Sequence, residues 1–320
     1  MTSFMRRGER ISCERTLVVC LSGLLLTFCN SESTIRPEPT PDAASGPKAG
    51  AAGSGSAGAG GASGKAGGAP HKCPEGLPGP PLVEVTFPDG AAYCIDATEV
   101  TQAQYHDFAS AKKGDMAGQP EVCVFNKSWV PEVMGPEQPA GCPKGYYEPG
   151  QNADLPMVCT NWCQAKAYCE WAGKRLCRAA GGGKVDAKSP EGATDPRSEW
   201  YNACTQRGKT RYPYGDTYDA AKCYFNGKGP DWFPAAATSP LVADCHGTEP
   251  PFDRLLNMSG NVGEWEDSCD FPELGDRLCR LRGGSVQTPV ELHDRFECSS
   301  PERGYPAELT VGAGIRCCTD

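Results

Sequence analysis

The feature that most restricts the fold of this 320-residue chain is its content of 19 cysteines. The cysteines do not form repeated C-x-x-C pairs, so their pattern favours disulfide bonds over zinc sites. Disulfides form in oxidising compartments, outside the cytoplasm. The formal net charge of -9 points away from nucleic acid as a partner. We therefore expect a disulfide-rich extracytoplasmic domain.

Residues 1–28 have the pattern of a signal peptide. Four arginines precede an apolar run of 12 residues from Leu17 to Phe28, which is shorter than the roughly 20 residues of a membrane span. The sequence Leu-Thr-Phe-Cys that ends at Cys29 resembles a bacterial lipobox, although Phe28 replaces the expected small residue. We expect lipidation of Cys29 and attachment of the protein to a membrane through this lipid. Ordinary signal cleavage nearby is the alternative.

The remaining chain divides into a tether and one domain. Residues 30–72 show no apolar periodicity, and residues 49–69 are nearly all Gly, Ala and Ser, which predicts a disordered tether. Residues 73–320 are long enough for one large domain with its own core. If Cys13 and Cys20 leave with the signal and Cys29 carries the lipid, sixteen cysteines remain, all from Cys73 onward.

Two segments predict helices. Residues 92–108 indicate a strand, a turn and a helix with Thr101 as its N-cap and with Tyr105 and Phe108 in the core. Residues 156–177 place apolar side chains at helical spacing, and Gly173 marks the end of the helix. The apolar positions of this second helix are Trp162, Ala165, Tyr168 and Cys169.

Residues after the second helix could be mistaken for a phosphate site. We expect Lys174 and Arg175 to bind helix-end carbonyls and nearby acids. The glycine run 181–183 lies in a polar insertion and predicts a loop, because no strand-loop-helix frame surrounds it. Close spacing suggests three local disulfides: Cys123–Cys142, Cys223–Cys245 and Cys269–Cys279.

The segment 257–265, Asn-Met-Ser-Gly-Asn-Val-Gly-Glu-Trp, predicts a turn rich in oxygen ligands that ends at a buried aromatic residue. Asn257 and Glu264 offer side-chain oxygens. Gly260 allows the backbone to turn so that carbonyl groups face inward. This composition suits a hard cation, and a polar turn held by hydrogen bonds of Asn257 and Asn261 is the alternative.

Five motifs, in the same order, resemble the formylglycine-generating enzyme family, also called sulfatase-modifying factor domains. They lie at 92–108, 156–176, 212–216, 257–265 and 282–285, and a final Gly-Ile-Arg at 314–316 completes the resemblance over about residues 80–320. The resemblance implies an α+β fold related to C-type lectins, disulfide-rich and with long ordered loops. It also implies the disulfides Cys169–Cys317 and Cys204–Cys298.

The resemblance implies a structural calcium ion bound by Asn257, Gly260, Val262 and Glu264, with the second and third contributing backbone carbonyls. A second calcium loop of the family falls within residues 217–256. That segment of this chain does not match the loop, so only the first calcium site is expected.

The oxidase chemistry of the family does not carry over. Its two copper-binding cysteines correspond to Thr288 and His293, and these side chains cannot form the two-thiolate site that selects cuprous copper. Gly263 replaces a tryptophan of the family motif, and Ser285 alone persists. Iron-dependent relatives need a pair of histidines at helical spacing. The four histidines, His71, His106, His246 and His293, provide no such pair.

We therefore predict a non-catalytic binding module, exported and lipid-anchored, that recognises an extracytoplasmic peptide, protein or glycan. The alternative is an oxidase of the formylglycine-generating type that acts on a cysteine in sulfatase-like substrates through an altered site.

Overall fold

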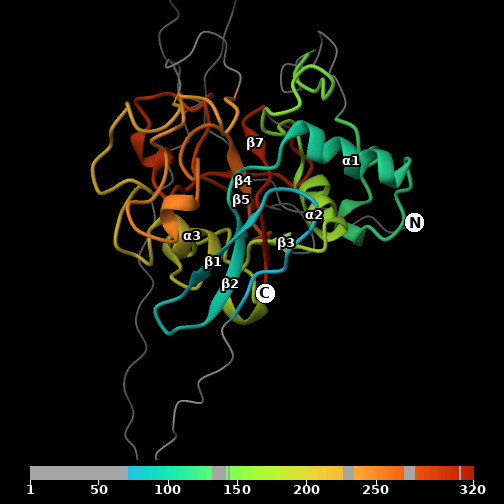
Figure 1. Ribbon diagram of the computed structural model, residues 1–320. Coiled ribbons are helices and arrows are strands. Elements are labelled where there is room, and N and C mark those ends of the chain that lie inside the picture. The colour runs from blue at the N-terminus through green and yellow to red at the C-terminus, as the bar shows by residue number, and fades with distance from the viewer. Residues whose placement is uncertain (1–70, 132–141, 143–144, 226–233, 270–277, 310) are drawn as a thin grey trace, which may run out of the picture. The chain divides into compact units, whose positions relative to one another are not determined.

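The computed structural model describes residues 71–131, 142, 145–225, 234–269, 278–309 and 311–320 (Figure 1). The predicted signal peptide, Cys29 and the tether up to residue 70 lie outside these residues. All described residues belong to one compact unit, residues 65–320. Among the described residues, no helix is both long and apolar enough to cross a membrane.

The regular elements are short and are joined by long loops. The α-helices are α1 (Gln102–Lys112), α2 (Trp162–Trp171) and α3 (Glu199–Cys204). Single 3₁₀ turns occur at Glu121–Cys123, Ala180–Gly182, Glu191–Thr194, Phe252–Arg254 and His293–Phe296. The strands are β1 (Leu82–Thr86), β2 (Ala92–Asp96), β3 (Arg175–Leu176), β4 (Gly263–Trp265), β5 (Cys279–Arg282), β6 (Arg303–Gly304), β7 (Ala313–Gly314) and β8 (Cys317–Thr319).

The two predicted helices form where the sequence places them. Thr101 caps α1, since its hydroxyl accepts a hydrogen bond from the Gln104 amide and the Gln104 side chain accepts one from the Thr101 amide. Asn161 and Gln164 form the same reciprocal pair at the start of α2. Helix α2 ends at Trp171, and the positive φ of Gly173 turns the chain towards β3.

The strands form two small sheets. One has the order β1-β2-β8-β3 and is antiparallel, so the last strand of the chain lies between two strands that precede it by more than a hundred residues. The other has the order β6-β5-β4-β7, with β4 and β7 parallel. Helices α1 and α2 pack together on one side of the sheets, and α3 lies on the other side (Figure 1).

The largest core cluster lies between α1, α2 and the second sheet. Tyr105 and Phe108 of α1 are fully buried there, as predicted, and contact Tyr168 of α2. Trp265 of β4 is also fully buried, and its indole donates a hydrogen bond to the Thr160 carbonyl. The aromatic residue at the end of the 257–265 segment therefore anchors the segment in the core.

Eight disulfides hold the loops to this core. The predicted pairs Cys169–Cys317, Cys204–Cys298, Cys223–Cys245 and Cys269–Cys279 are all present. The predicted pair Cys123–Cys142 is wrong. Two pairs that the sequence analysis did not identify are Cys73–Cys94 and Cys177–Cys318.

The error at Cys123 has a packing cause. Cys163 lies in the first turn of α2, and the 3₁₀ turn that carries Cys123 packs against it, so these two residues form the bond. Cys142 pairs instead with Cys159, immediately before α2. The prediction relied on closeness in sequence, which pointed to Cys142 as the partner of Cys123. The correct partners of both cysteines are determined by where α2 packs.

Lys174 and Arg175 are structural, as expected. The Lys174 ammonium forms a buried ion pair with Asp96, with an N–O distance of 2.6 Å, and donates to the Pro80 carbonyl. Arg175 pairs with Glu199 and with Asp320. The interactions are mainly with acids rather than with helix-end carbonyls.

Candidate functional site

The segment from Asn257 to Glu264 folds as a buried turn with an unusual backbone. Asn257, Gly260 and Asn261 have φ values of 62°, 72° and 56°. Asparagine and glycine are the residues that enter this left-handed region most readily. A Cβ atom at position 260 would lie 2.7 Å from the Tyr224 carbonyl oxygen. The residue types of the turn are therefore set by its backbone.

Glu264, at the end of this turn, is surrounded by donors. The Arg316 Nε atom lies 2.9 Å and 2.8 Å from its two carboxylate oxygens, and the Trp200 indole donates to Oε2. Arg316 also donates to the carbonyl groups of Asp96 and Leu256. Glu264 and Arg316 are both almost fully buried, so they form an ion pair inside the domain.

Glu99 is a second buried carboxylate beside the turn, and the sequence analysis did not assign it a role. Its oxygens accept hydrogen bonds from the side-chain amides of Asn257, at 3.0 Å, and Asn261, at 2.8 Å. Burial raises the pKa of Glu99 to about 7, with nearby Arg316 opposing the rise and Glu264 adding to it. The sequence signal available for this role was the position of Glu99 two residues before Thr101, the N-cap of α1.

The donor set of the turn fits a hard cation. The Asn257 Oδ1 atom is buried and has no hydrogen-bond partner among the residues that the structure describes, which is costly unless something else satisfies it. Asn257 is one of the predicted calcium ligands. Glu264 is another predicted calcium ligand. Its carboxylate offers about four lone-pair positions, and the contacts with Arg316 and Trp200 occupy three of them. Calcium binds such oxygen ligands.

A cleft of about 540 Å³ lies beside the Arg282-Gly-Gly-Ser285 motif. Ser285 and Thr288 both line it, and the Thr288 hydroxyl accepts a hydrogen bond from the Ser285 amide at 3.0 Å. The remaining lining residues combine apolar, amide and charged groups: Trp265, Leu278, Leu281, Gln287, Pro289, Arg295, Pro301, Glu302, Arg303, Gly304, Glu308 and Gly312.

The two positions that correspond to the family's copper cysteines separate in this structure. Thr288 lines the cleft and is buried. His293 is exposed and does not line the cleft; its ring stacks on Tyr218, with ring centroids 4.2 Å apart. The structure therefore brings Ser285 and Thr288 together at the cleft but does not bring His293 there.

Gly263 also affects the cleft. A Cβ atom at this position would lie 2.9 Å from the Leu281 Cγ atom and 3.2 Å from the Gly312 carbonyl oxygen. Leu281 and Gly312 both line the cleft. Because position 263 carries no side chain, its backbone can lie this close to Leu281 and Gly312. A tryptophan at this position would force these neighbours to move.

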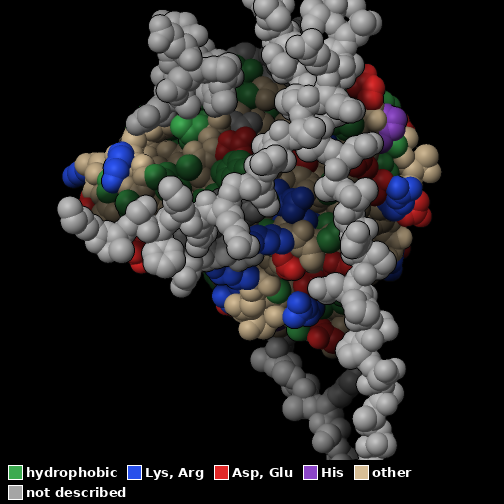
Figure 2. Space-filling view, turned by 180° about the vertical axis from the view of Figure 1, so that it is seen from behind, with side chains coloured by type: hydrophobic (Ala, Val, Ile, Leu, Met, Phe, Trp, Pro, Cys, Tyr) green, Lys and Arg blue, Asp and Glu red, His purple; other side chains and the backbone are tan. Residues whose placement is uncertain are grey.

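The charged groups of the cleft have both signs. Arg295 and Glu302 form an ion pair at 2.9 Å, and burial raises the Glu302 pKa while the hydrogen bond from Arg295 opposes the rise. Arg303 and Glu308 lie on the same cleft. Basic and acidic side chains are interspersed in the same way over the visible part of the surface in Figure 2.

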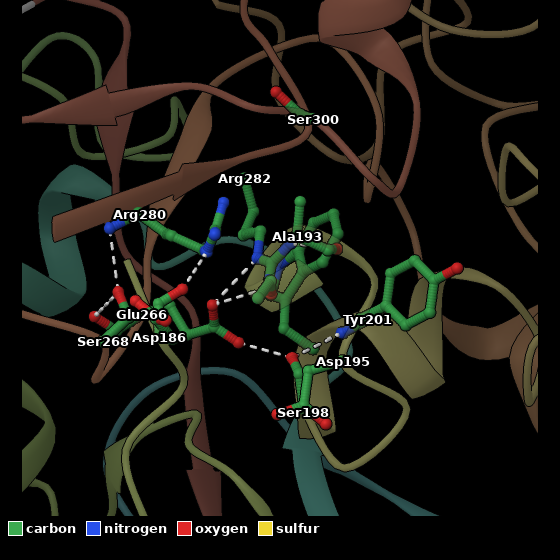
Figure 3. A network of polar contacts seen from close by, with 12 residues as sticks. Asp186, Ala193, Asp195, Ser198, Tyr201, Glu266, Ser268, Arg280, Arg282 and Ser300 are labelled. Carbon is green, nitrogen blue, oxygen red and sulfur yellow. Dashed lines mark hydrogen bonds and ion pairs between the residues drawn. The ribbon is translucent and has the colours of Figure 1, made fainter. Parts of the chain in front are cut away.

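Strand β5 connects the cleft to a buried polar network (Figure 3). Successive side chains of a strand point to opposite faces, so Leu281 faces the cleft while Arg280 and Arg282 face the other side. Arg282 pairs with Glu266 at 2.8 Å, and Glu266 also accepts a hydrogen bond from Ser198.

The two arginines also bind the polar insertion after the glycine run. Arg280 donates to the carbonyl groups of Asp186 and Ser189, and Arg282 to those of Gly192 and Ala193. Residues 186–193 therefore brace the strand that forms one wall of the cleft.

The sixteen cysteines from Cys73 to Cys318 all form disulfides. Cys177, Glu199 and Cys318 bring potential metal-ligand atoms within 4.8 Å of one another. The two cysteines are bonded to each other and Glu199 binds Arg175, so these three residues are structural.

The chain folds as a disulfide-stapled α+β domain with a cleft of mixed polar and apolar lining. The model of the sulfatase-modifying factor enzyme 1-like domain matches residues 54–320. The chain belongs to this family, and the match begins inside the segment predicted as a tether.

Two relatives and one solved structure illustrate the similarity. The formylglycine-generating enzyme of Bos taurus is 23% identical over 319 residues, which cover 79% of this chain and 78% of the relative. The inactive C-alpha-formylglycine-generating enzyme 2 of Mus musculus is 26% identical over 279 residues, which cover 76% of this chain and 80% of the relative. PvdO from Pseudomonas aeruginosa has 19% identity and a TM-score of 0.44, over 75% of this chain and 84% of that chain.

Proposed function

We propose that this protein is a non-catalytic, extracytoplasmic binding module whose ligand occupies the cleft at Ser285 and Thr288. The observation that carries the proposal is the chemistry of the cleft wall. It offers hydroxyl, amide, guanidinium, carboxylate and apolar groups, whereas every cysteine of residues 73–320 is held in a disulfide. A two-thiolate copper site needs free cysteines.

The mixed lining favours a peptide segment of a protein as the ligand. Arg295 and Glu302 place a cation and an anion at the same wall, which suits the alternating polar groups of a peptide backbone and its charged side chains. Leu281, Pro289 and Pro301 line the cleft and are at least partly exposed, so they supply the apolar contact area. A glycan is the other ligand class with many hydroxyl groups for such donors and acceptors.

Binding arrays test this proposal with a matched pair of variants. Full-length protein is screened against peptide and glycan arrays, and the affinity for the selected ligand is measured by calorimetry. Arg295→Ala removes a cleft cation and should weaken binding about tenfold or more, because charge-assisted hydrogen bonds contribute about 1.5–3 kcal/mol. His293→Ala changes an exposed residue of the same 3₁₀ turn and should bind like wild type. Equal losses in both variants would contradict ligand binding in the cleft.

The second candidate function is an oxidase of the formylglycine-generating type with an altered site. The similarity to the enzyme of Bos taurus favours it. It would require a cysteine released from one of the disulfides, and such a release would be measured as a free thiol on the folded protein. A peptide containing C-x-P-x-R, incubated with copper and with molecular oxygen as the oxidant, would then be converted to the formylglycine product with consumption of oxygen.

Export and anchoring form part of the proposal. The arginine-flanked apolar run before Cys29 supports a lipidated N-terminus, and the eight disulfides support folding in an oxidising compartment. Cys29→Ser should release the protein from the membrane fraction and leave the folded domain intact. A wild-type protein found free of the membrane after export would contradict lipidation.

We also propose that calcium binds the Asn257 turn and stabilises the domain. Two features support this assignment: the Asn257 oxygen, which meets no donor from the described residues, and Glu264 at the end of the same turn; Gly260 and Val262 would supply the backbone carbonyls. A ligand that binds only the folded state adds RT ln(1 + [L]/Kd), about 3 kcal/mol at a hundredfold excess over Kd. Equal melting temperatures in calcium and in chelator would contradict the site.

A further inference from the structure

Three carboxylates are buried close to the Asn257 turn, and they differ in how their charge is compensated. Asp96 pairs with Lys174 at 2.6 Å, and Glu264 pairs with Arg316 at 2.8 Å. Glu99 is only 2% exposed and forms no ion pair with any residue that the structure describes. Its hydrogen-bond donors are the neutral amides of Asn257 and Asn261. A buried carboxylate without a cation is strongly unfavourable.

Glu99 also determines how the Asn257 side chain is oriented. The Asn257 Nδ2 atom donates to Glu99 at 3.0 Å, so Oδ1 must point to the opposite side of the amide. The flipped orientation would place Oδ1 against a carboxylate oxygen of Glu99 and would lose the hydrogen bond that Nδ2 donates. Oδ1 is therefore held in a fixed direction, although no donor from the described residues meets it there.

Asn261 provides an internal contrast. Its Oδ1 accepts a hydrogen bond from the Ala235 amide at 2.7 Å, and its Nδ2 donates to the Ala235 carbonyl at 3.0 Å as well as to Glu99. The Asn261 amide thus keeps its orientation without Glu99. Among the two asparagines, only Asn257 depends on Glu99 for the direction of its oxygen.

We propose that Glu99 is the positioning residue of the calcium site: it turns the Asn257 oxygen towards the ion and supplies the buried negative charge that the ion balances. This inference rests on the calcium site proposed above and adds a residue outside the 257–264 segment. It explains two otherwise costly features together, since one bound divalent cation satisfies the orphaned oxygen and adds a direct counter-charge to a carboxylate that forms no ion pair with any described residue.

Calcium-dependent stability of the full-length protein tests this inference. The rise in melting temperature between chelator and saturating calcium, and the calcium Kd from calorimetry, are measured for wild type, Glu99→Gln and Asp96→Asn. Loss of a residue that orients a metal ligand typically weakens metal affinity 10- to 100-fold. We expect that loss in Glu99→Gln. Asp96→Asn also removes a buried carboxylate, but Asp96 does not contact Asn257, so its calcium Kd should match wild type.

The outcomes separate the two proposals. A wild-type response that persists unchanged in Glu99→Gln overturns the role of Glu99 and leaves the calcium site standing. No response in wild type overturns both. A loss in Asp96→Asn as large as that in Glu99→Gln also overturns the positioning role, because it would show a general effect of buried charge.

A second variant covers the case in which Glu99→Gln does not fold. Asn257→Asp presents an oxygen on both sides of the side chain and places one of them against Glu99. Calcium should therefore raise its melting temperature more than that of wild type. An equal or smaller rise would overturn the inference.

Discussion

The cysteine pair at the last strand offers a quantitative test of how the chain is stapled. Cys317 and Cys318 are adjacent in β8, and they bind Cys169 in α2 and Cys177 just after β3. When one of these disulfides is intact, the other closes a ring of only about ten residues. The chain-entropy model gives about 2.7 kcal/mol for such a ring. Removing either disulfide alone should therefore cost about 2.7 kcal/mol.

Removing both disulfides should cost more than twice that amount. Once one of the two disulfides is gone, the other closes a larger ring. The shortest path around this ring runs through the Cys204–Cys298 bond and contains about 55 residues. The chain-entropy model gives about 4.2 kcal/mol for opening a ring of this size. The quadruple variant should thus lose about 7 kcal/mol, or about 1.5 kcal/mol beyond the sum of the two pairwise losses.

Urea unfolding followed by tryptophan fluorescence measures this coupling. The variants replace Cys169 and Cys317, Cys177 and Cys318, or all four residues by alanine. The lost side-chain contacts are common to the single-pair and quadruple variants, so the double-mutant cycle isolates the ring term. Strictly additive losses would refute the shared-ring reasoning.

Three further predictions address the interior and the cleft. Arg282→Ala leaves Glu266 buried without its cation and should lower the free energy of unfolding by about 3–5 kcal/mol in urea, whereas Arg282→Lys should recover part of it. In chelator, the raised pKa of Glu99 should make the free energy of unfolding fall by on the order of 3 kcal/mol as the pH rises from 4.5 to about 7, because the folded state retains the proton longer. Glu99→Gln should remove this contribution from pH-dependent unfolding and leave the part below about pH 6 that comes from Asp96, whose pKa burial raises to about 6. Gly263→Trp should displace Leu281 into the cleft and abolish binding of the ligand selected on the arrays, while a wild-type affinity would contradict the contact.

Local sequence signals predicted the helices well. The Thr101 cap, the spacing of Tyr105 and Phe108, and Gly173 after α2 act within a few residues of one another, so the chain alone specifies them. The resemblance to the family added the two long-range disulfides at Cys169 and Cys204. The α+β fold followed from the same resemblance, and the family match supports it.

Contacts that depend on packing were harder to predict. Cys123 bonds to Cys163 because α2 packs beside its turn, and no local pattern reports that contact. Glu99 meets Asn257 across 158 residues, so its place beside the turn appears only in the folded chain. The glycine run 181–183 was predicted as a loop within a polar insertion, but the binding of residues 186–193 to Arg280 and Arg282 required the structure.

The same limit applies to the candidate site. Aligning the chain with the family placed Thr288 and His293 at the two copper positions. In the structure Thr288 lines the cleft, while His293 stacks on Tyr218 outside it. The residue types predicted the change in chemistry, and the fold determined which of the two positions still faces the cleft.

The most direct test of the binding-module proposal is a combined thiol and product assay on the exported protein. Protein purified without reductant is titrated for free thiols under denaturing conditions and incubated with copper, oxygen and a C-x-P-x-R peptide, whose product is analysed by mass spectrometry. We predict no free thiol in residues 73–320 and an unchanged peptide. Formation of formylglycine by the wild-type protein would contradict the proposed function.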